Sequence, residues 1–159
     1  MACVIASHDI PGHPAAVRAR ALCCMATADS AVPALRRFAG GVAGRWGVPE
    51  AVADTARLVV SELVTNAVLH SGAPDVTVLL AHRGDGLSIE VAERGQWRHR
   101  SAPRRAPEDE DAACGRGLEL VKGVSAWWRA VLTPAGSRIA AYLPFADPAD
   151  PVAAVTAAA

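Results

Sequence analysis

The segment SELVTNAVLH, residues 61–70, is the most informative stretch of this 159-residue chain. Glu62 and Asn66 are four residues apart, so in a helix they share one face, with the apolar residues Val59, Leu63 and Ala67 beside them. A carboxylate and a carboxamide next to a buried stripe are costly unless they have partners. One such partner is Mg²⁺, which accepts an Asn oxygen together with phosphates and water, and a glutamate one turn earlier can act as a base. The alternative is an ordinary amphipathic helix with both polar residues at its wet edge.

Two helices are predicted in this part of the chain. Apolar residues recur at helical spacing over residues 30–46, and Asp29 or Ser30 is a suitable cap for that helix. A second helix is predicted over residues 49–70, because Pro49 suits a first helical turn. The informative segment therefore forms the last part of the second helix.

Downstream of residue 72 the sequence predicts strands and one more helix. An Asp-Gly pair at residues 85–86 lies between two β-branched runs and indicates a hairpin. Residues 96–113 lack periodicity and are expected to form a long functional loop. We expect strands at residues 76–80, 87–91, 128–132 and 139–145, and a helix at 115–124. This order predicts an α+β fold, a two-layer α/β sandwich with helices on one face of a mixed, mostly antiparallel sheet.

Two shorter motifs can also carry chemistry. In Glu93-Arg94-Gly95, a carboxylate at a strand end can accept a hydrogen bond from an exocyclic amine, and the glycine lets a flat base approach the backbone. In Gly115-Arg116-Gly117-Leu118, glycines opening a helix expose N–H groups that can hold phosphates. The alternatives are a charged strand end with a turn glycine and an ordinary loop-to-helix turn. A Walker loop, GxxxxGK[ST], does not occur.

Bulk composition narrows the classes of function. Lys and Arg number 16, as do Asp and Glu, so the net charge is zero and argues against nucleic-acid or membrane surfaces. No apolar run is long enough to span a bilayer. Four cysteines without metal-ligand spacing indicate reduced thiols and a cytoplasmic location. We expect one domain over residues 28–146, between a flexible N-terminal arm, 1–27, and a disordered tail, 147–159.

In their order along the chain, these motifs resemble those of the histidine-kinase-like (GHKL) ATPases, and within them the small anti-sigma factor kinases of Gram-positive bacteria. Residues 61–67 are similar to the N-box of that family. Glu93-Arg94-Gly95 is similar to its first glycine box and Gly115-Arg116-Gly117-Leu118 to its second. The resemblance covers about residues 29–145 and implies a Bergerat-type sandwich that binds ATP and Mg²⁺.

The resemblance also implies a role for each motif residue. Asn66 would hold Mg²⁺ between the phosphates, and Glu62 would be the base toward a serine or threonine hydroxyl of a partner protein. Glu93 stands where the family has an aspartate that recognises the adenine amine, and its extra methylene is expected to weaken adenine binding. The other cofactor-binding residues implied are Gly95 and Ser137 near the base, and Gly115, Arg116, Gly117 and Leu118 at the phosphates.

The predicted function is that of an ATP–Mg²⁺-binding regulator, a serine/threonine kinase anti-sigma factor that binds a sigma factor and phosphorylates an anti-anti-sigma partner. Members of the family typically pair as homodimers. The alternative is an interaction module of the same fold with little or no kinase activity, which the altered Glu93 position favours. A third interpretation, a nucleic-acid binder, is disfavoured by the neutral charge balance.

Overall fold

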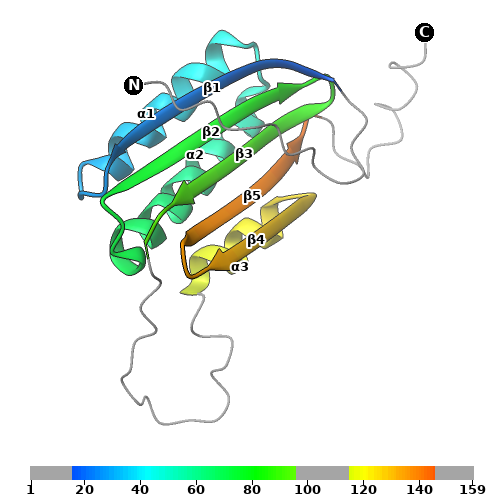
Figure 1. Ribbon diagram of the computed structural model, residues 1–159. Coiled ribbons are helices and arrows are strands. Elements are labelled where there is room, and N and C mark those ends of the chain that lie inside the picture. The colour runs from blue at the N-terminus through cyan, green and yellow to red at the C-terminus, as the bar shows by residue number, and fades with distance from the viewer. Residues whose placement is uncertain (1–15, 96–114, 146–159) are drawn as a thin grey trace, which may run out of the picture.

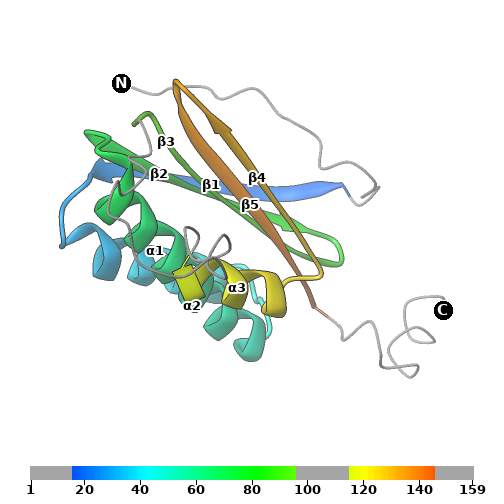
Figure 2. The same cartoon turned by 90° about the horizontal axis from the view of Figure 1, so that it is seen from below.

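The computed structural model describes residues 16–95 and 115–145. They form a five-stranded sheet in the order β1-β2-β3-β5-β4, and three α-helices pack on one of its faces (Figures 1 and 2). The predicted two-layer α+β sandwich is confirmed, and every strand pairing within it is antiparallel. The elements are β1 Val17–Ala26, α1 Ala31–Arg45, α2 Glu50–Asn66, the π-helical turn η1 Ala67–Ser71, β2 Asp75–Arg83, β3 Gly86–Glu93, α3 Gly115–Val124, β4 Trp127–Thr133 and β5 Gly136–Pro144.

Helices α1 and α2 agree closely with the helical periodicity of the sequence. Helix α1 begins after Ser30, although the Ser30 side chain makes no capping hydrogen bond. Helix α2 begins after Pro49 and ends at Asn66, four residues before the predicted end at His70. The chain continues from Asn66 through η1 to Gly72, whose φ of 63° lies in the left-handed region that favours glycine. A widened turn therefore follows the polar edge of α2 directly.

Strand β1 is where the structure departs most from the sequence prediction. A flexible arm is predicted over residues 1–27, but Val17–Ala26 is an edge strand paired with β2. Partly buried and exposed residues alternate along it, as expected for a strand with one face on the core. The inward residues Ala21, Cys23 and Met25 are small or unbranched, so they give a weak strand pattern. Residues 1–15, the loop at 96–113 and the tail at 147–159 lie outside the described residues.

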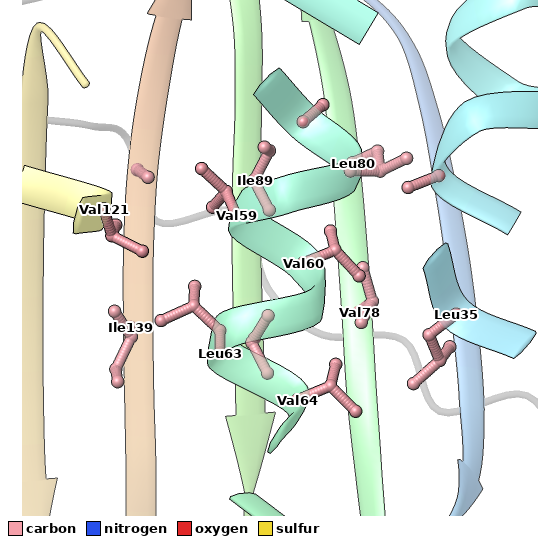
Figure 3. Packing of buried hydrophobic residues seen from close by; sticks show 14 of the residues in the cluster. Leu35, Val59, Val60, Leu63, Val64, Val78, Leu80, Ile89, Val121 and Ile139 are labelled. Carbon is pink, nitrogen blue, oxygen red and sulfur yellow. The ribbon is translucent and has the colours of Figure 1, made fainter. Parts of the chain in front are cut away.

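The core lies between the helices and the inner face of the sheet (Figure 3). Helix α2 crosses the middle of the sheet, and its apolar side chains point toward those of β2, β3 and β5. The largest fully buried side chains are all Leu, Ile or Val, so the two layers come into close contact. This packing fixes the position of α2, and with it the polar residues along its edge. The residues labelled in Figure 3 are Leu35, Val59, Val60, Leu63, Val64, Val78, Leu80, Ile89, Val121 and Ile139.

Aromatic rings close one end of the sandwich, which we call the packed end and define by Trp46, His82 and Phe145. The Trp46 and His82 rings are edge to face, with centroids 6.1 Å apart, and the His82 and Phe145 rings lie 5.0 Å apart. The backbone N–H of Phe145 donates to the Asp85 carbonyl at 2.9 Å. The end of α1, the β2–β3 hairpin and the end of β5 are therefore joined at this end.

Candidate functional site

The predicted motif residues gather at the opposite end of the sandwich, which we call the site end. Strand β3 runs from the packed end at Gly86 to the site end at Glu93, where it pairs with Ser137 at the start of β5. The end of α2 with Asn66 and the start of α3 lie at this same end of the molecule (Figure 1). The structure thus brings together three motifs that lie far apart in the chain.

Glu62 on α2 lies directly against Gly117 in the first turn of α3. A Cβ atom added to Gly117 would be 2.5 Å from Glu62 Oε2, closer than real side chains approach. A glycine is therefore required at this position if the carboxylate is to remain where it is. The proposed base of the N-box and the proposed phosphate-binding turn are in contact, although 55 residues separate them along the chain (117 minus 62).

Asn66, the last residue of α2, carries a buried polar group without a partner. Its Nδ2 is buried and makes no hydrogen bond to any of the described residues. An unsatisfied buried N–H group costs about 1–3 kcal/mol, so such a group needs a specific reason to persist. A phosphate oxygen can accept from Nδ2, while the carboxamide oxygen is a ligand type that Mg²⁺ accepts. The side chain thus has the groups that a metal–phosphate site needs, and its role there stays a prediction.

Glu93 and Ser137 form a buried polar pair on the inner face of the sheet. They are directly opposite each other on β3 and β5, and their side chains are 5% and 7% exposed. They continue the rows of core residues that end in Val91 and Ile139, so both point toward the helix layer. The resemblance implies that both residues lie near the adenine, which stays a prediction.

The carboxylate of Glu93 also has a local contact. Its Oε2 accepts a hydrogen bond from the backbone N–H of Gly95, two residues further along. The Glu93 side chain thus folds back toward its own backbone, a local contact that acidic side chains readily make to the N–H two residues on. One carboxylate oxygen is therefore already hydrogen-bonded. This contact reduces the capacity of Glu93 to accept a hydrogen bond from an adenine amine.

Gly95 makes a close backbone approach to the loop that follows η1. A Cβ atom on Gly95 would collide with the Ser71 carbonyl and lie 2.6 Å from the Ala73 nitrogen. That loop is itself fixed, because Ser71 Oγ donates to the Ala67 carbonyl at 2.6 Å and accepts from the Ala73 N–H at 3.1 Å. In this structure Gly95 therefore joins the end of β3 to the end of α2.

Helix α3 starts at Gly115, as the glycine motif predicts. The first four N–H groups of a helix have no partner within the helix and can bind an anion. Leu118 is 6% exposed and belongs to the core, so it anchors this turn to the sandwich. The side chain of Arg116 lies outside what the structure describes.

Two contributors to the site are missed by the sequence analysis. One is the π-helical turn that starts immediately after Asn66, a feature often found at functional sites. The other is Gly136, whose φ of 135° and close approach to the Arg94 Cα, 2.8 Å from an added Cβ, fix the β4–β5 hairpin beside Glu93. In the sequence, the glycine before Ser137 is the one signal of the hairpin contact beside Glu93. Nothing in the sequence signals the π-helical turn after Asn66.

Within the parts of the chain that the structure describes, no group of three or more His, Cys, Asp or Glu side chains could hold a metal ion. A magnesium ion held by one carboxamide together with phosphates and water does not need such a group. None of the helices in residues 16–95 and 115–145 has the length and apolar composition to cross a membrane.

The sequence matches a family model described as the histidine kinase-like ATPase domain, over residues 24–141. The matched region includes all three motifs and Ser137. No curated protein gives a significant match.

One similar solved structure is described as the RsbU and RsbW domains of Rv1364c from Mycobacterium tuberculosis. The TM-score is 0.62 and the sequence identity 19%, with 79% of this chain covered. This chain spans about a third of that protein, 32% of its length. At this level of identity, the likeness supports the fold.

Proposed function

This chain belongs to the histidine kinase-like ATPase family, and from that membership we propose that it binds ATP with Mg²⁺ and transfers the γ-phosphate to a partner protein. Membership implies the ATP site. The observation that carries the proposal is the contact of Glu62 with Gly117, because it puts a carboxylate beside a helix start suited to phosphates. The second support is Asn66 one turn later, whose buried Nδ2 makes no hydrogen bond to any described residue.

In this proposal, each motif binds a different part of Mg–ATP. Asn66 holds Mg²⁺ and a phosphate oxygen, and the metal neutralises phosphate charge when it is bound. The backbone N–H groups at Gly115 and Gly117 bind the phosphates. Glu93 and Ser137 receive the adenine amine at the inner face of the sheet.

Phosphoryl transfer then needs a base and an acceptor. A serine or threonine oxygen of the partner attacks the γ-phosphorus, and Glu62 takes the hydroxyl proton. The bond from the γ-phosphorus to the bridging oxygen breaks, and ADP leaves. We propose a sigma factor as the regulated partner and an anti-anti-sigma protein as the phosphate acceptor, on the motif resemblance to anti-sigma kinases.

A second candidate is an interaction module that binds nucleotide weakly and transfers no phosphate. It is favoured by the hydrogen bond between Glu93 and the Gly95 N–H, which occupies one oxygen of the base-recognition carboxylate. The two candidates share the fold and differ in nucleotide affinity and in phosphoryl transfer, so one set of variants separates them.

The first test is titration calorimetry of the full chain with Mg–ATP. We expect Asn66→Ala to weaken binding about 100-fold, because contacts to charged phosphates worth about 1.5–3 kcal/mol each are lost. Glu119→Gln removes an exposed carboxylate on α3 and serves as the control. Equal affinity of wild type and Asn66→Ala would refute the proposed metal–phosphate site.

The second test follows labelled phosphate from ATP to candidate sigma factors and anti-anti-sigma proteins of the same organism. Glu62→Gln should retain nucleotide binding and lose at least 99% of the transfer rate, about the 10²-fold that a general base contributes. Glu119→Gln should transfer at the wild-type rate. Binding without transfer in the wild-type chain would support the interaction module instead.

A further inference from the structure

Leu132 is a large apolar side chain that is 57% exposed, although its strand turns it toward the helix side of the sheet. On β4 it is directly opposite Ser137, which in turn is directly opposite Glu93 on β3. Residues directly opposite each other in an antiparallel sheet share a face. Leu132, Ser137 and Glu93 therefore form one row across three strands at the site end.

The row is polar and buried at one end, and apolar and uncovered at the other. By the usual strand spacing, Leu132 lies about 5 Å from Ser137 and about 10 Å from Glu93 along the row. Trp128, four residues earlier on the same face of β4, packs against the core. On the inner face of β4, the helices therefore cover Trp128 in part and leave Ala130 and Leu132 exposed.

Resting on the proposed ATP site, we propose that Leu132 is a base-contacting residue, covered by the purine ring whose amine meets Glu93. A ring held at one edge by Glu93 and lying along the row meets Leu132 at its other edge. Ligand sites typically combine apolar walls with a few polar groups that fix orientation, and this row has that composition. Covering an exposed leucine also stabilises the complex through the hydrophobic effect.

A docking partner is the competing explanation for an exposed leucine, and the placement of the other exposed apolar residues argues against it. Leu22 lies on β1 at the other edge of the sheet, and Leu69 lies on η1. Val124 is the last residue of α3 and lies near the start of β4, whereas Leu132 lies near its end. Val131 precedes Leu132 in β4 and points to the opposite face. These residues do not form a patch with Leu132, whereas protein interfaces need extended contact areas.

The test compares Leu132→Ser with Val131→Ser in the full chain, using Mg–ATP and Mg–tripolyphosphate as the two probes in calorimetry. Val131 is a matched control, since it is the adjacent residue, is 39% exposed and faces away from the site. Both variants change an exposed residue, and thermal unfolding checks that both remain folded. We expect Leu132→Ser to weaken ATP binding about tenfold, as lost burial of a leucine predicts. Tripolyphosphate binding, and both affinities of Val131→Ser, should stay within about twofold of wild type, since neither change touches the base.

A second readout uses methyl-labelled leucine and valine in NMR spectra. Saturation with Mg–ATP should shift the Leu132 methyl signals much more than those of Val131. Unchanged ATP affinity in Leu132→Ser overturns the inference, and so does an equal loss for ATP and tripolyphosphate, because the leucine would then shape the phosphate site. Retained ATP affinity with lost binding of a partner protein assigns Leu132 to docking instead. If the wild-type chain binds no ATP, the proposed function fails first and this inference fails with it.

Discussion

The same strands run through both ends of the sandwich, yet the two ends are built from different kinds of side chain. At the packed end, the rings of Trp46, His82 and Phe145 fill the space between the layers. At the site end, the corresponding positions are polar or lack a side chain, with Glu93 and Ser137 buried there. Burying polar groups opposes folding unless they have partners, whereas burying rings favours it. One end therefore supplies stability, and the other is arranged for a ligand.

Trp46→Ala at the packed end is the strongest test of whether the two ends have different roles. Trp46 is partly buried between α1 and His82, so its loss leaves a cavity there. We expect the free energy of unfolding to fall by about 3 kcal/mol. The affinity of the folded protein for Mg–ATP should stay within about twofold of wild type, because the packed end does not contact the ligand. Urea unfolding and calorimetry at a temperature where the variant is folded measure the two quantities.

Asn66→Ala is the counterpart at the site end. It removes a buried N–H group that has no hydrogen-bonding partner among the described residues, so it should leave the free energy of unfolding within about 1 kcal/mol of wild type while Mg–ATP binding weakens about 100-fold. If Trp46→Ala weakened ATP binding as much as it weakened folding, the two ends would be one cooperative unit, and the contrast would be wrong.

Gly95→Ala tests whether the site end is held together by close backbone approach. The new methyl group would collide with the Ser71 carbonyl, and backbone atoms give way less easily than a flexible side chain. We expect a loss of about 2 kcal/mol in the free energy of unfolding, typical of overpacking. ATP binding should also weaken, because displacing Gly95 moves the carboxylate of Glu93, two residues earlier in the chain.

Gly44→Ala is the matched control for Gly95→Ala. Gly44 lies in α1, and an added Cβ would meet nothing within 4 Å. Alanine is the better helix former, so this variant should gain about 0.5–1 kcal/mol. Similar behaviour of the two variants would show that Gly95 is an ordinary turn residue.

The fold was largely predictable because its main elements have clear periodicity. Helices α1 and α2 follow the spacing of their buried residues, and the β2–β3 hairpin follows from the Asp-Gly pair at residues 85–86. Strand β1 was not predictable in the same way, because alternating Ala, Cys and Arg residues have little preference for a strand. Pairing with β2, which the local sequence does not show, decides its conformation.

The candidate site was predictable as a set of residues, but its contacts were not. The order of the motifs along the chain indicates Glu62, Asn66 and the glycine turn together. That Glu62 touches Gly117 depends on how α2 and α3 cross, which is a tertiary property. The turn of Glu93 toward the Gly95 N–H depends on a local backbone geometry that the sequence does not specify.

Tyr142→Phe tests how much a hydrogen bond on the outer face of the sheet stabilises the packed end. The Tyr142 hydroxyl donates to Asp85 at 2.6 Å, so its loss should cost about 1 kcal/mol at pH 7. Burial, and then the hydrogen bond to Asp85, raise the pKa of Tyr142. A group whose pKa is raised on folding contributes stability that is present below the unfolded pKa and is lost as the pH rises. The difference between wild type and Tyr142→Phe should therefore shrink above about pH 10, where unfolded tyrosine ionises, as urea titrations at several pH values can measure.

The smallest effect on folding is expected for Gly117→Ala. This variant should lower the rate of phosphoryl transfer while leaving the free energy of unfolding nearly unchanged. The added methyl group would lie 2.5 Å from Glu62 Oε2, but this oxygen is the tip of a flexible side chain and can move away. Alanine also favours a helix over glycine, so the free energy of unfolding should change by less than about 1 kcal/mol. A displaced base transfers protons poorly, and a misplacement of about 1 Å can lower a rate about 100-fold.

Gly123→Ala, in the same helix α3, has nothing within 4 Å of its added Cβ and controls for the change in helix propensity. We therefore expect Gly117→Ala to fold normally, keep much of its ATP affinity and lose phosphoryl transfer to a partner, while Gly123→Ala keeps all three. Single-turnover transfer from labelled ATP, together with urea unfolding of each variant, makes the comparison. Wild-type transfer by Gly117→Ala would mean that the contact between α2 and α3 does not position Glu62 for chemistry, and the site end would then differ from the packed end only in how it binds.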